Sequence, residues 1–195
     1  MSGATKEEPP VIFLDIDGVL RTDDSGALMA IQDFENLQPG LVGNPTVYDP
    51  TAMAYLNHIC RITGARVVIC SAKRNERNLR HELVRAGFQG SFHRNWRTPL
   101  TERGSTRSGE ISAWLQKHPR VKNYVILDDD SLGADDHKNR WVQTPTTLGL
   151  GYLETMLALQ ILGVEQILKP LHIANKYDHI SKQLQRLAKR LRGLG

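Results

Sequence analysis

Residues 11–20 read VIFLDIDGVL, and this stretch decides the fold. Its first four residues form an unbroken apolar run of β-forming side chains, which predicts a strand buried in a parallel sheet. Asp15 and Asp17 follow at once, and Gly18 comes directly after them. The stretch therefore predicts a buried strand that delivers two carboxylates at its carboxyl end.

Outward from this strand, short apolar runs alternate with segments of helical periodicity. We expect further strands at residues 65–70, 124–127 and 141–143, and helices at 51–62, 75–86, 109–117 and 151–162. Residues 91–107 are polar and rich in arginine, and we interpret them as a loop. Strands that alternate with helices predict an α/β fold with a central parallel sheet.

Length and composition favour one compact domain. The chain has 195 residues, 40% hydrophobic and 24% charged, enough to bury a core without disulfides or a structural metal. Cys60 and Cys70 lie in apolar runs without the paired spacing of a zinc site, which predicts reduced core cysteines. The sequence shows neither a long apolar span nor a signal-like start, so we expect a cytoplasmic protein with no membrane partner.

The chain divides by composition into segments of different character. We expect a flexible N-terminus at residues 1–10, a main domain at 11–169 and a basic amphipathic C-terminal helix at 170–195. Within the main domain, residues 21–50 are rich in Gly, Pro, Asp and Asn, and they predict a long excursion that covers a site as a cap or flap.

The net positive charge of the chain is concentrated in the C-terminal segment. Residues 170–195 hold six Lys and Arg residues against Asp178, while the whole chain has a net charge of +4. Apolar residues recur there at helical spacing, at Ile173, Tyr177, Ile180, Leu184, Leu187 and Leu191. This seam fits docking on the main domain, a homodimer contact, or a helix whose basic face lies on nucleic acid.

Polar residues follow three of the predicted strands. Besides Asp15 and Asp17, Ser71 follows the strand at 65–70, and three aspartates at 128–130 follow the strand at 124–127. In open α/β sheets these carboxyl ends meet at one edge, where ligands bind. Clustered carboxylates repel one another unless a cation lies among them, and oxygen ligands favour Mg²⁺. A metal beside hydroxyl and basic groups predicts phosphate chemistry.

At these residues the sequence resembles the haloacid dehalogenase (HAD) superfamily of phosphohydrolases. The motif Asp-x-Asp-Gly-Val stands here as residues 15–19, and Ser71 matches the second motif. Arg107 is the best candidate for the third motif, and Asp128-Asp129 match the paired acids of the fourth.

Within the superfamily, VILDDD at 125–130 and WVQT at 141–144 are similar to the small HAD domains of nucleic-acid repair proteins, of the polynucleotide kinase-phosphatase type. The resemblance covers about residues 11–162 and departs at Ala72-Lys73, where that group has a second Ser and a Trp. It implies a three-layer Rossmannoid domain with a minimal cap.

The resemblance also implies roles for individual residues. Asp15 would be the nucleophile, and Asp17 the general acid and then the base. Phosphate would be bound by Ser71, Arg107 and backbone N–H groups around Gly18. Magnesium would be held by Asp15, the backbone carbonyl of Asp17, and Asp128 or Asp129.

Several alternatives stay open. Ser71 also suits a helix N-cap, and Lys73 or Arg74 could replace Arg107 as the basic residue of the third motif. Residues 73–107 carry nine Lys and Arg against three Glu, together with Phe92 and Trp96. This segment suits either contact with a nucleic-acid backbone or a solvated helix face with pairs such as Glu76 to Arg80.

The leading hypothesis is a Mg²⁺-dependent phosphatase that acts on a phosphorylated nucleotide or nucleic-acid end through an aspartyl-phosphate. The alternatives are a small-metabolite phosphatase and a non-catalytic nucleic-acid-binding or regulatory module. The intact pair Asp15 and Asp17 favours an enzyme, since a module that only binds does not need both.

Overall fold

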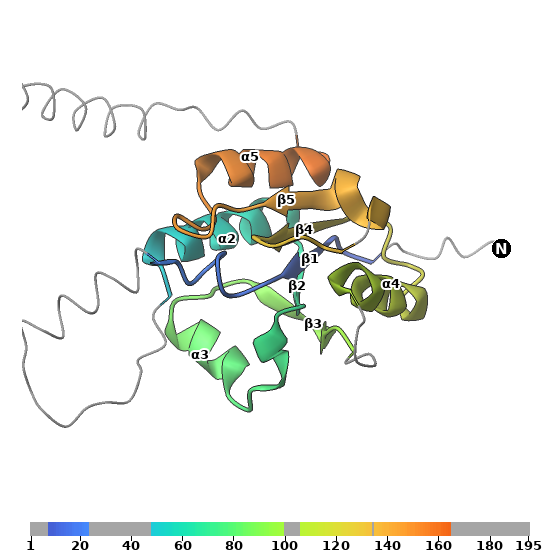
Figure 1. The fold of residues 1–195 in the computed structure, drawn as a ribbon, viewed down its shortest axis with the longest axis horizontal. Coiled ribbons are helices and arrows are strands. Elements are labelled where there is room, and N and C mark those ends of the chain that lie inside the picture. Colours follow the sequence, from blue (N-terminus) through green and yellow to red (C-terminus); the bar gives the residue numbers. More distant parts are fainter. Residues whose placement is uncertain (1–7, 24–47, 100–105, 134, 165–195) are drawn as a thin grey trace, which may run out of the picture. The chain divides into compact units, whose positions relative to one another are not determined.

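Five parallel strands form the centre of the computed structural model, which describes residues 8–23, 48–99, 106–133 and 135–164. The strands are β1 (Val11–Leu14), β2 (Arg66–Ile69), β3 (Ser91–Arg97), β4 (Tyr124–Asp128) and β5 (Trp141–Gln143). They lie in the order β3-β2-β1-β4-β5, and every pairing is parallel (Figure 1). This confirms the predicted α/β fold with a central parallel sheet.

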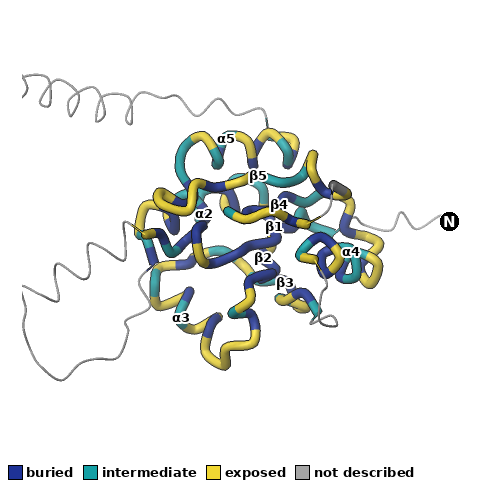
Figure 2. The backbone as a smooth tube through the Cα atoms, in the orientation of Figure 1, coloured by how far each residue is buried: buried dark blue, intermediate teal, exposed yellow. Residues whose placement is uncertain are grey.

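The register of the three inner strands places their carboxyl ends side by side. Leu14 at the end of β1 lies opposite Ile69 of β2 on one side and Leu127 of β4 on the other. The next residue, Asp15, donates its backbone N–H to the Leu127 carbonyl at 2.9 Å. All four residues of β1 are buried, and Figure 2 shows this burial along the inner strands. The residues that follow these strands therefore share one edge of the sheet.

Helices cover both faces of the sheet. They are α2 (Pro50–Thr63), α3 (Leu79–Arg85), α4 (Arg107–Lys117) and α5 (Tyr152–Ile161), with short 3₁₀ helices η1 (Ala72–Asn75) and η2 (Asp135–Arg140). On one face, Trp114 of α4 packs edge-on against Phe13 of β1, with ring centroids 5.2 Å apart. On the other face, α2 and α5 contact each other. This is the three-layer arrangement that the resemblance implies.

Local sequence determines where α2 begins and where it ends. Asp49 precedes the helix, and its carboxylate accepts hydrogen bonds from the backbone N–H groups of Thr51 and Ala52. Pro50 occupies the first turn, where the missing N–H costs nothing. The helix ends at Gly64, whose φ of 67° is the left-handed conformation that glycine adopts without strain.

The prediction of a loop at residues 91–107 is wrong in its first part, because Ser91–Arg97 forms the edge strand β3. Only His93 of this strand is buried, so the strand lacks the apolar run that marks the inner strands. Its register with β2 also shifts, since Val67 lies opposite Phe92 but Ile69 lies opposite Arg97. A polar, irregular edge strand shows neither a continuous apolar run nor a regular apolar/polar alternation, which are the two patterns by which strands are predicted.

The helix predicted at 75–86 is also shorter than expected. Ser71 caps the 3₁₀ helix η1, and Glu76, which follows its last residue, is extended with ψ of 132°. This extended residue interrupts the helical path, and α3 begins only at Leu79.

The structure also bears on the predictions for the cysteines and for membrane spans, but not on those for the chain ends. Cys60 and Cys70 are buried and form no disulfide with each other, as predicted. No helix in the described part of the chain is long and apolar enough to cross a membrane. The C-terminal helix predicted at 170–195 lies outside the described residues, as do most of the excursion at 21–50 and most of the N-terminus at 1–10.

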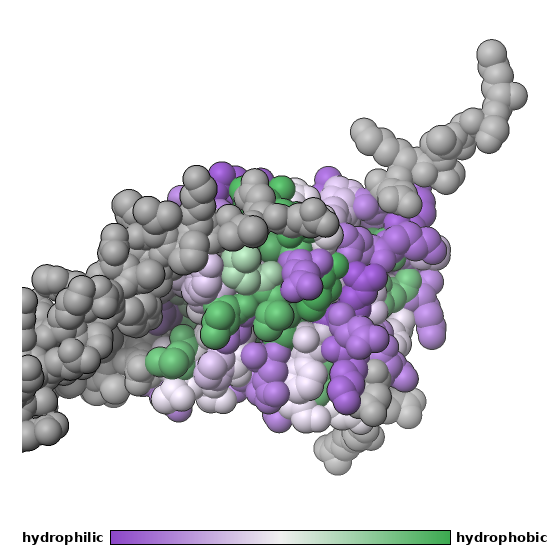
Figure 3. Space-filling model, turned by 90° about the horizontal axis from the view of Figure 1, so that it is seen from above, coloured by the Kyte–Doolittle hydropathy of each residue, from purple (hydrophilic) through white to green (hydrophobic). Residues whose placement is uncertain are grey.

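The outer side of α5 is apolar as well as its inner side. Leu153 and Leu157 of α5, and Leu148 before it, are each more than half exposed, at 68%, 52% and 65%. Figure 3 shows hydrophobic side chains gathered on this face of the molecule. The face lies on the opposite side of α5 from the sheet.

Candidate active site

Three aspartates meet at the edge where β1 and β4 end. One carboxylate oxygen each of Asp15, Asp128 and Asp129 lie within 4.8 Å of one another. Asp15 is 7% exposed and Asp128 is 1% exposed, so water screens their charges poorly. Such a group is stable only if positive charge lies close to it.

Arg107 supplies part of that charge. Its Nη1 atom lies 3.4 Å from Oδ1 of Asp15 and 3.2 Å from Oδ2 of Asp128. It is the first residue of α4, which Thr106 caps, so its side chain reaches the carboxylates from the N-terminus of that helix. Burial by itself would lower the pKa of this guanidinium, but its neighbours Cys70 and Asp15 raise it above its ordinary value. Arg107 therefore stays charged between the two buried acids.

One carboxylate oxygen of Asp128 has an ion-pair partner but accepts no hydrogen bond within the described residues. Burial raises the pKa of Asp128 to about 7, although Arg107 acts in the opposite direction. Its Oδ1 accepts a hydrogen bond from the Asp130 N–H at 3.1 Å. Its Oδ2 is buried and makes no hydrogen bond within the described residues. In the described part of the chain, its partner at Oδ2 is thus the charge of Arg107 alone, and three carboxylates that converge beside it are a donor set of hard oxygens, which fits Mg²⁺.

Asp129 is held in place by groups from β5 and the loop after it. Thr146 donates its hydroxyl hydrogen to Oδ2 of Asp129 at 2.9 Å, and the Gln143 amide donates to the Asp129 carbonyl at 3.0 Å. The sequence pattern does not single out Thr146, and it marks Gln143 only as part of the WVQT stretch, because the contacts of both residues with Asp129 are made across a loop.

Gly18 makes room for Asp129. Its φ is +72°, and a Cβ added there would lie only 2.7 Å from the Cβ of Asp129. Thr144 donates to the Gly18 carbonyl at 2.8 Å and so fixes this turn against β5. The glycine is required both for the turn and for the approach of the third carboxylate.

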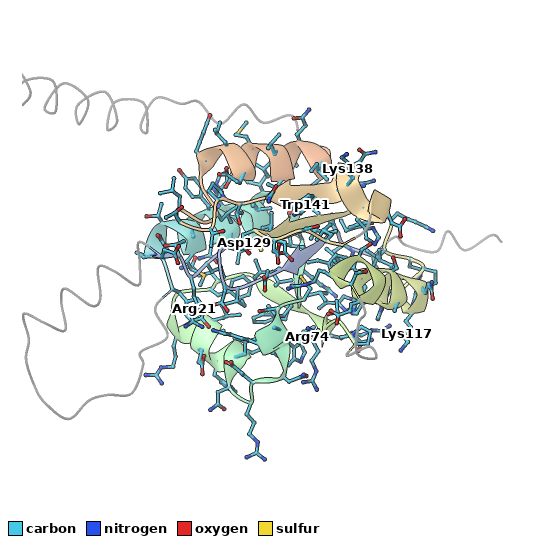
Figure 4. All side chains as sticks on the ribbon, in the orientation of Figure 1. Arg21, Arg74, Lys117, Asp129, Lys138 and Trp141 are labelled. Carbon is cyan, nitrogen blue, oxygen red and sulfur yellow. The ribbon has the colours of Figure 1, made fainter. Side chains whose placement is uncertain are left out.

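Asp17 lies further out than Asp15. Its side chain is 55% exposed, and Lys73 Nζ lies 3.1 Å from both of its carboxylate oxygens. Arg21 approaches Oδ1 at 3.4 Å. Two cations from different segments therefore fix the position of this carboxylate. Figure 4 labels Arg21, and it labels Asp129 on the segment that follows β4.

Arg74 is not part of the acidic centre. It is 4% exposed, and its Nη2 atom lies 2.6 Å from Oε1 of Glu110. It also donates to the carbonyls of Ser71 at 2.8 Å and Pro99 at 3.3 Å (Figure 4). Glu110 lies one helical turn after Arg107, so this buried pair joins the ends of β2 and β3 to the start of α4.

Ser71 is buried at the same edge and serves as a cap. Its hydroxyl oxygen accepts from the Lys73 N–H at 3.3 Å, which is the N-cap alternative left open by the sequence. It follows Cys70, whose N–H donates to the Leu14 carbonyl beside Asp15 at 2.9 Å. A role in binding phosphate stays a prediction.

The structure thus brings Asp15, Asp128, Asp129 and Arg107 together and places Gly18 against them. Of the three basic residues considered for the third motif, Arg107 contacts two of these acids, Lys73 contacts Asp17, and Arg74 pairs with Glu110.

Comparison with known proteins agrees with this arrangement. The family described as "HAD domain in Swiss Army Knife RNA repair proteins" matches residues 11–152, which include all five strands and every residue of the acidic centre. No curated protein and no solved structure gives a match. The chain therefore belongs to the HAD superfamily, in the family of HAD domains found in Swiss Army Knife RNA repair proteins.

Proposed function

We propose that this protein is a Mg²⁺-dependent phosphatase that removes a terminal phosphate from a nucleotide or a nucleic-acid end. One observation carries the proposal: Asp15, Asp128 and Asp129 converge on one point, and Arg107 bridges two of them. Membership of a HAD family supports phosphatase-type chemistry, and its occurrence in RNA repair proteins supports a nucleic-acid substrate.

The reaction would proceed in two steps. In the first, a carboxylate oxygen of Asp15 attacks phosphorus, and the bond from phosphorus to the ester oxygen breaks while Asp17 protonates that oxygen. In the second, the Asp17 carboxylate takes a proton from water as the water oxygen attacks phosphorus. The bond from phosphorus to Asp15 then breaks, which releases inorganic phosphate and restores both acids.

Other residues of the chain would position these groups. Lys73 and Arg21 hold the Asp17 carboxylate at the mouth of the site, where a leaving oxygen and water both have access. Arg107 and the start of α4 face the phosphoryl oxygens with positive charge, and such preorganised charge stabilises the transition state. Ser71 would add a hydroxyl contact from the neighbouring strand.

A magnesium ion would be held by Asp15, Asp128, Asp129 and the backbone carbonyl of Asp17. When bound, it supplies positive charge that offsets the repulsion between the carboxylates and an incoming phosphate. The convergence of one carboxylate oxygen from each of the three aspartates supports this assignment.

Metal removal provides a direct test. We expect EDTA to abolish phosphate release and added Mg²⁺ to restore it. Asp129→Asn should raise the Mg²⁺ concentration needed for half-maximal activity by about tenfold or more, because one charged ligand is lost. Asp130→Asn is the matched control, because Asp130 is exposed in the same loop and lies outside the acidic cluster. Full activity in EDTA would contradict the metal assignment.

The substrate class is tested by comparing phosphate release from oligonucleotides phosphorylated at the 3′ or 5′ end, mononucleotides and sugar phosphates. We expect one type of oligonucleotide end to be the best substrate, with little dependence on base sequence. Its hydrolysis should slow markedly between about 50 and about 200 mM salt, because backbone contacts release counterions. A preference for sugar phosphates, or equal efficiency on oligonucleotides and mononucleotides, would favour a small-metabolite or small-nucleotide phosphatase instead.

A further inference from the structure

Arginine side chains stack on two aromatic rings beside the active-site edge. The Cζ atom of Arg80 on α3 lies 5.0 Å from the ring centroid of Phe92 and 5.5 Å from that of Trp96, both on β3. The Cζ atom of Arg97 lies 5.2 Å from the Trp96 ring centroid. Both arginines are exposed and both rings are partly exposed. We call these four residues the arginine–aromatic ladder.

The ladder favours nucleic-acid contact over the other interpretation that the sequence left open for this basic segment. A solvated helix face would pair Arg80 with Glu76, but within the described residues no salt bridge joins them. Arg80 instead lies over two rings. Attraction between a guanidinium and a ring face holds the arginine at the surface, where its N–H groups can also donate to an anion.

The segment that carries the ladder holds further arginines without a salt bridge to a described residue. Arg77, Arg85 and Arg94 are exposed, and none of them forms a salt bridge with a described residue. Like charges at this density repel one another, and a polyanion relieves the repulsion. The charge therefore favours a partner with several phosphates rather than one.

The ladder begins next to the acidic centre. The N–H of Thr98, which follows β3, donates to the Ile69 carbonyl at 3.0 Å, two residues before Ser71. Arg97 donates to Oδ1 of Asn75 at 3.4 Å. Asn75 is the last residue of η1, which also carries Lys73, the partner of Asp17. A chain that leaves the active site over η1 therefore reaches Trp96 and then Phe92.

We propose that the arginine–aromatic ladder binds the single strand of nucleic acid whose phosphorylated end enters the active site. Unpaired bases stack on aromatic rings and on guanidinium planes, and every base offers such a face, so binding tolerates any sequence. Bases in a duplex cannot stack in this way. The role as a substrate track rests on the proposed phosphatase function, but the binding itself does not require turnover.

The experiment measures binding of a fluorescent, unphosphorylated single-stranded oligonucleotide to the full chain by anisotropy. We expect Trp96→Ala and Arg80→Ala each to weaken binding by about tenfold, and Trp96→Phe to keep most of it. Arg80→Lys keeps the charge but loses the planar guanidinium group on which a base can stack, so it should also weaken binding. Lys138→Ala, which removes an exposed cation from η2, should leave binding close to wild type.

Separate outcomes distinguish the ladder from the phosphatase proposal. Wild-type affinity in both Trp96→Ala and Arg80→Ala would overturn the ladder, and so would equal affinity for a duplex of the same length. Circular dichroism of each variant checks that the fold is kept, and Arg80→Ala is the decisive variant because its side chain is exposed. If the ladder variants lose oligonucleotide binding but the wild-type protein releases phosphate from none of the substrates, the ladder is upheld and the proposed function is overturned.

Discussion

Asp15→Asn is expected to lower phosphatase turnover by at least about 10⁴-fold while the protein stays folded. The amide has nearly the shape of the carboxylate, so the buried site between Arg107 and Asp128 can still form. An amide oxygen, however, is a poor nucleophile toward phosphorus. The other two acids of the cluster lie at the end of β4 and cannot take the place of Asp15. Steady-state phosphate release from the purified variant, with its thermal unfolding curve, measures both effects.

Two further variants provide a control for this prediction and a test of the role of Asp17. Asp130→Asn should keep wild-type turnover, because its exposed side chain accepts from the Ser131 N–H, and its backbone N–H, which donates to Asp128, is retained in the variant. Asp17→Asn should lose most turnover on natural esters but keep slow reaction with activated leaving groups, which need little protonation. Wild-type turnover in Asp15→Asn would exclude the covalent route.

Arg74→Met is expected to lower the free energy of unfolding by about 3–5 kcal/mol. The side chains of Arg74 and Glu110 are only 5% and 11% exposed, so removal of the arginine leaves a buried carboxylate without its partner. The substitution also removes hydrogen bonds to the carbonyls of Ser71 and Pro99. Urea unfolding of wild type and variant measures the difference.

The control and the rescue for this variant come from the same region. Arg77→Met should change the free energy of unfolding by only about 0.5 kcal/mol, because Arg77 is exposed and has no salt-bridge partner among the described residues. The double variant Arg74→Met with Glu110→Leu should recover part of the loss, since no charge is then left buried. Equal unfolding energies for Arg74→Met and Arg77→Met would contradict a stabilising role.

The acidic centre could be predicted because its parts are local. Asp15 and the pair Asp128-Asp129 each follow an apolar run directly, and an apolar run of this length is a buried strand whatever lies beside it. Parallel strands bring their carboxyl ends to one edge. Two local patterns and one topological rule were therefore enough to bring these acids together.

The edge strand β3 could not be predicted in the same way. It is buried on little of its surface, and it carries polar residues where inner strands carry Val and Ile. Its pairing with β2 also shifts between Val67 and Ile69. The strand forms because β2 offers it an unpaired edge, and that information lies in the sheet rather than in residues 91–97.

By itself, then, the sequence determined the α/β class, the position of β1 and the convergence of carboxylates after β1 and β4. Only the tertiary structure decided the partner of each basic residue: Arg107 joins Asp15 and Asp128, Lys73 joins Asp17, and Arg74 joins Glu110. Long cationic side chains can reach several acids, and the spacing of these residues in the sequence does not predict which acid will lie close. The choice is made when the helices pack on the sheet and fix the direction of each side chain.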